Sequence, residues 1–520
     1  MSTSPEATSL VPKSRLYGIV FALMLGMLLA ALDGSIVSTA LPTIVGDLHG
    51  ANHLSWVVVA YLLASTVSTP LWGKFGDLHG RKLYFIAAII VFLVGSVLCG
   101  VAGNMTALIL FRALQGLGGG GLMVGAQAVM ADLVSPAERG RYSGFFGGVW
   151  GASTVLGPLL GGFLVDSLSW RWIFYVNLPL GALALVMCVI LLPHSTNRRE
   201  HVIDWAGVVT LLIGSSALVL FTSLGGNSFA WLSPWSVGLA VTGVLFTVAF
   251  FAVERRSAEP ILPPSLFRNR VFSSASAIGF VTGFAMFGST TFLPLFFQIV
   301  DHASPTDSGL RLVPMMAGVF VCSVTVGQLV AKGWKYRPFP IAGTAIMTGG
   351  LALFATMTPA TSATAVSLYM IILGSGMGLV MQVLVTSVQN AVPMQDIGAA
   401  TAGANFFRSM GGSFGTAVFG ALYSNELPSA LARNLAARGI HGHGIPLDNW
   451  SPKFLLSLPT NVVDAIVHAV SDTIDHIFVW SIVVGVIAFV VSLTLPEVAM
   501  RRTIHPTADE IPMSNAESIL

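Results

Sequence analysis

The sequence predicts an all-α integral membrane protein with about fourteen membrane-spanning helices. Three observations predict this class. Hydrophobic residues make up 54% of the 520 residues and charged residues only 9%, whereas soluble domains average about 25% charged residues. The apolar residues gather in runs of about 20, the length that a helix needs to cross a bilayer. Lysine and arginine gather in every second loop between these runs. The net charge of +2 is too small to indicate nucleic-acid binding.

The apolar runs place the predicted spans along the whole chain. They lie at about 16–40, 54–72, 83–103, 106–130, 141–165, 173–192, 204–224, 234–253, 272–299, 309–331, 338–357, 363–388, 399–424 and 474–495.

Basic residues orient these spans. An even number of spans puts both termini on one side, and nearly all the lysines and arginines of the loops fall there. The short loops opposite hold only Arg171 and Arg311. Since positive charge is retained on the cytoplasmic side, both termini are predicted to be cytoplasmic, in a multi-pass protein of the plasma or inner membrane.

Two stretches combine glycine with polar or kinking residues. In "GKFGDLHGRK", residues 73–82, Gly73, Gly76 and Gly80 permit close backbone approach. Asp77 can accept hydrogen bonds from the start of a helix or from an arginine, and Arg81 and Lys82 anchor the cytoplasmic side. An ordinary basic loop is the alternative interpretation.

In "GASTVLGPLLGG", residues 151–162, small residues follow one helix flank and allow close packing between helices. Pro158 lies among them and bends the helix. The glycines are Gly151, Gly157, Gly161 and Gly162. A stiff interface that discourages leak is one interpretation, and a generic packing helix is the other.

These stretches, with "RALQG" at 112–116, "LDGSIVSTALPTI" at 32–44 and "WRWIFYVNLPLG" at 170–181, resemble the major facilitator superfamily. Within it they are similar to the fourteen-helix drug:proton antiporters of the EmrB/QacA type. The resemblance is tight in the first half of the chain and loose in the second, where "AKGWKYRPF" lacks the aspartate. It implies that residues 73–82 form a conformational gating loop and 151–162 an antiporter helix motif.

The resemblance implies two six-helix bundles with two extra central helices between them. The predicted parts are a disordered cytoplasmic tail at 1–12, a first bundle at 13–192, the inserted helices with their flanking loops at 193–271, a second bundle at 272–495, and a cytoplasmic tail at 496–520. The second bundle includes a long outer loop at 425–473, part of which has the periodicity of an amphipathic surface helix. That loop is a possible docking site for a partner.

Asp33 and Arg112 are the predicted proton-coupling pair. A charge inside a span costs about 2.5–3.5 kcal/mol even on the lenient insertion scale. Both residues lie about 10 Å below the outer end of their spans, at 1.5 Å per residue, so they can pair if their helices adjoin. Burial favours protonated Asp33 and Arg112 favours the ionised form, which suits a proton carrier. A permanent salt bridge is the alternative.

Several polar and aromatic residues within the spans are candidates for a substrate cavity. Each polar one has interhelical hydrogen bonding as its alternative, and each aromatic one lipid or core contact. The candidates are Gln115, Trp150, Phe284, Gln298, Gln382 and Asn405. Arg408 is predicted near the inner start of its span, as an inner-gate or packing residue.

The predicted function is proton-coupled multidrug efflux by alternating access, with a role in antibiotic resistance. The substrates are expected to be small and hydrophobic, and cationic because Asp33 would face them. Export of a lipid, siderophore or other metabolite is the first alternative, and a membrane receptor or scaffold is the second. No enzyme activity, metal site, cofactor or nucleic-acid partner is expected, and the proton gradient supplies the energy.

Overall fold

The computed structural model describes residues 12–48, 54–193, 204–225, 229–440 and 458–501. The described chain is almost entirely helical. Its helices are α1 Lys13–Leu48, α2 Leu54–His79, α3 Arg81–Gly100, α4 Met105–Leu133, α5 Pro136–Ser167, α6 Trp172–Tyr175, α7 Asn177–Leu191, α8 Trp205–Leu224, α9 Pro234–Glu254, α10 Pro264–Arg268, α11 Arg270–Thr290, α12 Leu293–Ile299, α13 Pro305–Leu310, α14 Val313–Ala331, α15 Pro338–Phe354, α16 Ala363–Ala391, the 3-10 helix η2 Met394–Asp396, α17 Ile397–Ala437 and α19 Thr460–Ser492.

Local sequence signals explain where many helices begin. The side chains of Asn104, Asp204 and Ser362 cap α4, α8 and α16 by accepting a backbone N–H from the first turn. Proline opens α5 and α9, where its missing N–H costs nothing. Between such ends the chain stays helical, because a helix satisfies its backbone polar groups internally and so tolerates lipid.

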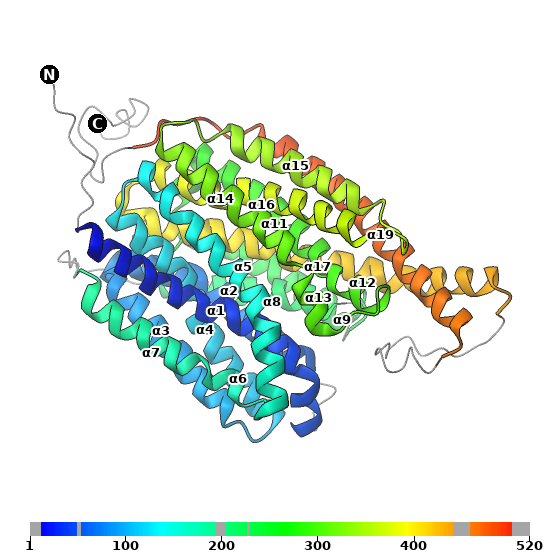
Figure 1. Cartoon of the computed structure of the whole chain (residues 1–520). Coiled ribbons are helices and arrows are strands. Elements are labelled where there is room, and N and C mark those ends of the chain that lie inside the picture. The colour runs from blue at the N-terminus through cyan, green and yellow to red at the C-terminus, as the bar shows by residue number, and fades with distance from the viewer. Residues whose placement is uncertain (1–11, 49–53, 194–203, 226–228, 441–457, 502–520) are drawn as a thin grey trace.

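The helices pack as an N-terminal group, α1–α7, and a C-terminal group, α11–α19 (Figure 1). Each group buries apolar side chains of its own: one cluster joins α1, α3, α4, α5 and α7, and another joins α11, α12, α14, α15, α16, α17 and α19. The two groups meet mainly where α5 runs beside α14 and α2 runs beside α17.

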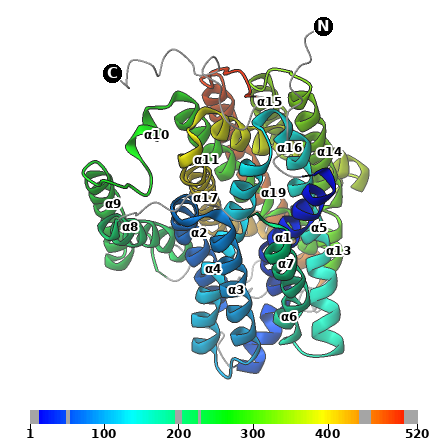
Figure 2. The ribbon, with the colours of Figure 1, turned by 90° about the vertical axis from the view of Figure 1, so that its left-hand side faces the viewer.

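The helices α8 and α9 lie beside the two groups (Figure 2). Their buried side chains, among them Val208 and Phe250, share one cluster with Phe406 and Met410 of α17, and Leu63 of α2 packs against it. The pair therefore covers the α2–α17 seam from outside.

The described chain begins and ends at the same end of the bundle (Figure 1). Arg15, near the start of α1, donates to the Leu191 carbonyl at 3.0 Å. Arg501 donates to the Gln389 carbonyl at 2.9 Å. We call this the basic end, because Arg15, Arg81, Arg139 and Arg501 all lie there.

Two predicted loops prove to be helical. Residues 73–79 form the last turns of α2 and Arg81 opens α3, so only Gly80 lies between them, with a φ of 100° that favours glycine. The predicted outer loop 425–473 is largely an extension of α17 to Ala437 and of α19 from Thr460. Leu431 and Ile466 belong to one buried cluster, so the extensions pack on each other. Its central part, 441–457, lies outside the described residues, as do 1–11 and 502–520 of the predicted tails.

Twelve helical segments in the described part of the chain are long and apolar enough to cross a membrane. The predicted spans at 338–357 and 399–424 correspond to α15 and α17 and are not among the twelve. The helix α15 has only 17 residues, and α17 is 41 residues long but carries polar residues and glycines where it would cross. The predicted spans at 272–299 and 309–331 are each broken, at 291–292 and 311–312.

Helix packing in the C-terminal group depends on Gly374 of α16. A Cβ placed there would overlap the Met315 carbonyl of α14. We expect Gly374→Ala to lower the free energy of unfolding by about 1–3 kcal/mol through overpacking. The matched control is Gly349→Ala on α15, where a Cβ meets nothing within 4 Å and the better helix former adds up to about 1 kcal/mol. Thermal unfolding in detergent measures both, and equal effects would contradict this account of the packing.

Candidate functional site

Asp33 lies in a fully buried polar cluster and is paired with Arg112, so the predicted contact is confirmed. Arg112 Nη1 is 2.5 Å from Asp33 Oδ2. Gln115 Nε2 donates to Asp33 Oδ1 at 2.7 Å, and Gln115 Oε1 accepts from Arg112 Nη1 at 2.8 Å. Asp33 and Arg112 are each 1% exposed and Gln115 is fully buried. The three side chains thus close a ring of hydrogen bonds.

Two helices supply the side chains of this ring, and a third, α2, packs against it. Asp33 comes from α1, and Arg112 and Gln115 come from successive positions on one face of α4. The Tyr61 ring of α2 lies 4.3 Å from the Arg112 guanidinium carbon, close enough for a cation–π contact. The Val57 carbonyl accepts from Arg112 Nε at 3.3 Å. The positive charge therefore has partners besides Asp33.

Sequence reasoning missed Ser96 and Asn177. Asn177 Nδ2 donates to Ser96 Oγ at 3.0 Å and lies 3.5 Å from Asp33 Oδ1. The chain breaks between α6 and α7 just before Asn177, and Pro179 follows in the first turn of α7, where proline is tolerated. A polar residue in an apolar run was the available signal, but it does not name its partner.

Asp77 joins the two groups at the basic end. Its carboxylate accepts the backbone N–H of Gly398 at 3.0 Å and of Ala399 at 2.8 Å. These are first-turn donors of α17, which helix geometry leaves unpaired and which favour a negative charge. Asp77 also accepts from Arg81 at 2.8 Å. Both partners predicted for Asp77, a helix start and an arginine, are present.

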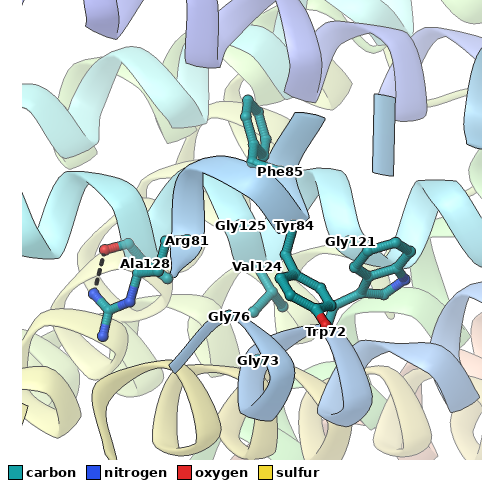
Figure 3. Close-up of a pocket in the computed structure, with 10 residues that line it drawn as sticks. All are labelled: Trp72, Gly73, Gly76, Arg81, Tyr84, Phe85, Gly121, Val124, Gly125 and Ala128. Carbon is teal, nitrogen blue, oxygen red and sulfur yellow. Dashed lines mark hydrogen bonds between the residues drawn. The ribbon is translucent and has the colours of Figure 1, made fainter. Parts of the chain in front are cut away.

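Arg81 holds Asp77 in place from within the N-terminal group. Its other contacts within this group are Asp132 at 2.5 Å and the Ala128 carbonyl at 2.6 Å, and the latter bond is drawn in Figure 3. It lies at a small pocket between α2, α3 and α4 whose walls include Gly73, Gly76 and Trp72. Since all these walls belong to the N-terminal group, the pocket is not a passage between the two groups. Lys82 points elsewhere and donates to the Leu192 carbonyl at 2.6 Å.

A second set of hydrogen bonds crosses between the groups beside Asp77. Arg139 donates to Gln389 Oε1 at 3.1 Å. Gln127 accepts from Asn405 through its side chain at 2.7 Å and from Gln389 through its carbonyl at 3.4 Å. With the two Asp77 bonds and one from Arg81 to the Met394 carbonyl, six hydrogen bonds join the groups near the basic end. This end of the molecule is closed.

Arg139 precedes the apolar span Phe145–Val165 and is 2% exposed. Burial lowers the pKa of its guanidinium to about 9, and the charges of Arg81 and Arg501 lower it in the same direction. Three arginines therefore repel one another at the closed end, and Asp132 offsets part of the repulsion.

The predicted helix motif 151–162 makes the close contacts that its glycines allow. Gly157 admits Ser35 of α1, whose hydroxyl donates to the Ser153 carbonyl at 2.9 Å. Gly151 faces Met316 of α14, and Pro158 lies against Gly309. Gly161 is buried and Gly162 partly buried. One helix thus packs on both groups.

The predicted cavity residues do not gather in one place. Gln115 is hydrogen-bonded to Asp33, and Asn405 is hydrogen-bonded to Gln127. The others are spread over α5, α11, α12 and α16: Trp150 is 39% exposed, Phe284 packs on Phe419 with ring centroids 5.4 Å apart, Gln298 donates to Ser308 at 3.0 Å, and Gln382 lines a small pocket near Met500. Among the described residues, no three His, Cys, Asp or Glu side chains form a metal-ligand group.

The model of the Major Facilitator Superfamily matches residues 23–416. The chain belongs to this family. An uncharacterized MFS-type transporter of Mycobacterium tuberculosis, Rv1877, is 42% identical over 95% of this chain and 71% of its own length. Multidrug resistance protein 3 of Bacillus subtilis is 34% identical over 94% of this chain and 97% of its own. This facilitator is therefore a transporter by family, with multidrug efflux proteins among its homologues.

The fold agrees with the family. The proton:xylose symporter XylE superposes with a TM-score of 0.61 over 95% of this chain and 99% of its own, at 16% identity. At that identity the likeness extends to the fold alone.

The Asp77 contact predicts how the facilitator holds its basic end closed. We expect Asp77→Ala to raise the exchange rate of the Gly398 and Ala399 amides about tenfold or more, because hydrogen bonds to a charged acceptor are worth about 1.5–3 kcal/mol. Asp132→Ala is the control, since it also takes a carboxylate from Arg81 but has no bond to α17. Hydrogen–deuterium exchange of the start of α17 measures both. Equal rates in the two variants would remove Asp77 from the closure.

Proposed function

We propose that this facilitator is a proton-coupled exporter of hydrophobic, amphipathic compounds, of the drug:proton antiporter branch, working by alternating access. The observation that carries the proposal is the buried ring of Asp33, Arg112 and Gln115. A carboxylate at this depth in the membrane is costly and marks a functional site by default. Its hydrogen-bond partners allow it to exist in both protonation states.

In the ionised state Asp33 forms an ion pair with Arg112 and accepts a hydrogen bond from the amide of Gln115. In the protonated state its O–H needs an acceptor. Asn177 Oδ1, a buried atom without a hydrogen-bond partner among the described residues, belongs to the amide 3.5 Å from Asp33. A rotation of that amide supplies the acceptor. Arg112 keeps Gln115 Oε1, the Val57 carbonyl and the Tyr61 ring, so it is not stranded when Asp33 is neutral.

Alternating access requires contacts that form on one side and break when the two groups rock. The six hydrogen bonds at the basic end suit this role, because each joins the N-terminal group to α16, η2 or α17. The excess of lysine and arginine at this end favours the cytoplasm as its side, with both termini there. The closed state then faces outward, where a proton can reach Asp33 and a substrate can leave.

The fourteen-span topology is part of the proposal. The helix α15 packs between α16 and α19, and at 1.5 Å per residue its 17 residues span about 26 Å. The helix α17 packs along α11 and α2 and is long enough to cross. Counting both gives two six-helix bundles, with α8 and α9 as the inserted pair.

The burial of Asp33 changes the expectation of a cationic substrate. That expectation required the carboxylate to face the substrate, whereas its partners surround it within the N-terminal group and leave it 1% exposed. Asp33 therefore acts on the substrate through conformation and not by contact. Export of a lipid, siderophore or metabolite on the same scaffold, and a receptor role, are the alternatives, since fold alone does not fix the substrate.

Asp33→Asn in proteoliposomes tests the proton role. We expect substrate-driven proton flux and uphill transport to fall to background, because asparagine cannot exchange a proton. Downhill substrate exchange should continue, since Asp33 does not touch the substrate. Asp47→Asn, the same change on the same helix at a side chain 58% exposed, is the control. Full coupling in Asp33→Asn would exclude the role, and loss of exchange in a correctly folded variant would favour a permanent structural salt bridge.

The substrate class is tested by overexpression. We expect lower susceptibility to several hydrophobic compounds in a panel of cations, neutral compounds and acids. A protonophore should abolish the difference, since it collapses the gradient that drives export. An unchanged susceptibility across the panel would favour export of an endogenous lipid or metabolite.

A further inference from the structure

A second arginine lies in the middle of the bundle, and no described residue gives it a countercharge. Arg408 is eleven residues from the start of α17 at Ile397, which places it about 16 Å from the basic end of that helix. The hydrocarbon core of a bilayer is about 30 Å thick, so Arg408 lies near its centre and not at the inner start of the span. In the described part of the chain it has no hydrogen bond or ion pair, in contrast to Arg112.

The position of Arg408 on α17 places it between the two groups. Thr401, Asn405 and Arg408 follow one another at spacings of four and three, so they share one side of the helix. Thr401 accepts from Gln389 at 3.0 Å, and Asn405 donates to Gln127 of α4. Arg408 is the next residue on this side, one turn beyond the hydrogen bonds that close the basic end.

The neighbours of Arg408 hold its stem and leave its head partly exposed. A Cβ at Gly283 of α11 would lie 3.3 Å from Arg408 Cγ, so the aliphatic stem runs along a glycine surface. Arg408 itself is only partly buried. Two aromatic residues follow Gly283 on α11: Phe284 is partly buried and packs on Phe419, and Phe287 is 37% exposed and faces Gly412. The stem of Arg408 thus lies on the glycine surface of a helix that also carries phenylalanines.

An arginine stays charged at physiological pH, so it does not lower its cost by losing a proton there. A charge in the membrane interior needs a partner or a water-filled cavity. Closure of the opposite end, which alternating access requires, would remove the water from around Arg408. Because no described residue pairs with Arg408, a partner from outside the chain can then supply the countercharge.

We propose that Arg408 binds the anionic group of the transported compound, so that this facilitator exports hydrophobic acids and not hydrophobic cations. The inference rests on the proposed function and names its substrate class. A guanidinium matches a carboxylate with two parallel hydrogen bonds, and the phenylalanines of α11 offer surface for the apolar body. Asp33 remains the proton site, at a different depth and within the N-terminal group.

Pyrene butyric acid and its methyl ester test the charge requirement, because they share an apolar body and differ in the carboxylate. We expect the wild-type protein in detergent to bind the acid about tenfold or more tightly than the ester, measured by fluorescence. In Arg408→Gln the ratio of the two Kd values should fall to about one, and Arg408→Lys should keep part of it. Arg433→Gln, on an exposed arginine of the same helix, should keep the full ratio.

Equal binding of acid and ester by the wild-type protein would overturn the proposal, as would an unchanged ratio in Arg408→Gln. The wild-type comparison decides the matter even if the Arg408 variants do not fold. A measurement of proton flux distinguishes a failure of this inference from a failure of the proposed function. Flux driven by a neutral or cationic compound, with no preference for the acid, would remove the role of Arg408 and leave proton-coupled export standing.

Discussion

The interaction on which the rest of the site depends is the ion pair between Asp33 and Arg112. Neither charge is tolerable alone at that depth, so each requires the other, and the pair requires further donors and acceptors for its remaining hydrogen bonds. Gln115 and Asn177 supply them directly, from two different helices, and Ser96 of a third helix accepts a hydrogen bond from each of these two amides. The cost of burying two charges thus dictates how five helices of the N-terminal group meet.

At the basic end a carboxylate is again paired with an arginine, but it also has partners in the other group. There Asp77 pairs with Arg81 inside one group and also receives the first N–H groups of α17 from the other. The first partner is permanent in any rigid-body movement of the groups, and the second is not. A contact shared in this way can hold a closed state and still be broken without stranding a charge.

Two polar side chains on the same side of α17 differ in whether they have a partner. Asn405 is used in the contact with Gln127, while Arg408, one turn further along the same side, has no partner in the described chain. The glycines of α11 and α17 let the two helices approach closely at this level, since Gly411 and Gly415 face the Phe280 and Phe284 backbone. The same helix therefore both seals one end and carries an unpaired charge one turn beyond the seal.

The membrane class, most helix positions, the matched depth of Asp33 and Arg112 and the two kinds of partner that Asp77 accepts could be predicted from the sequence. All of these follow from hydropathy and from distance along a helix, which measure depth in the membrane. Tertiary structure alone decided which residues at one depth are neighbours. Asn177 and Ser96 join Asp33, Gln115 is committed to the ring, residues 425–437 and 460–473 are helical, and Arg408 is mid-membrane and unpaired. Position around the helix bundle depends on packing between distant segments, and no local pattern records it.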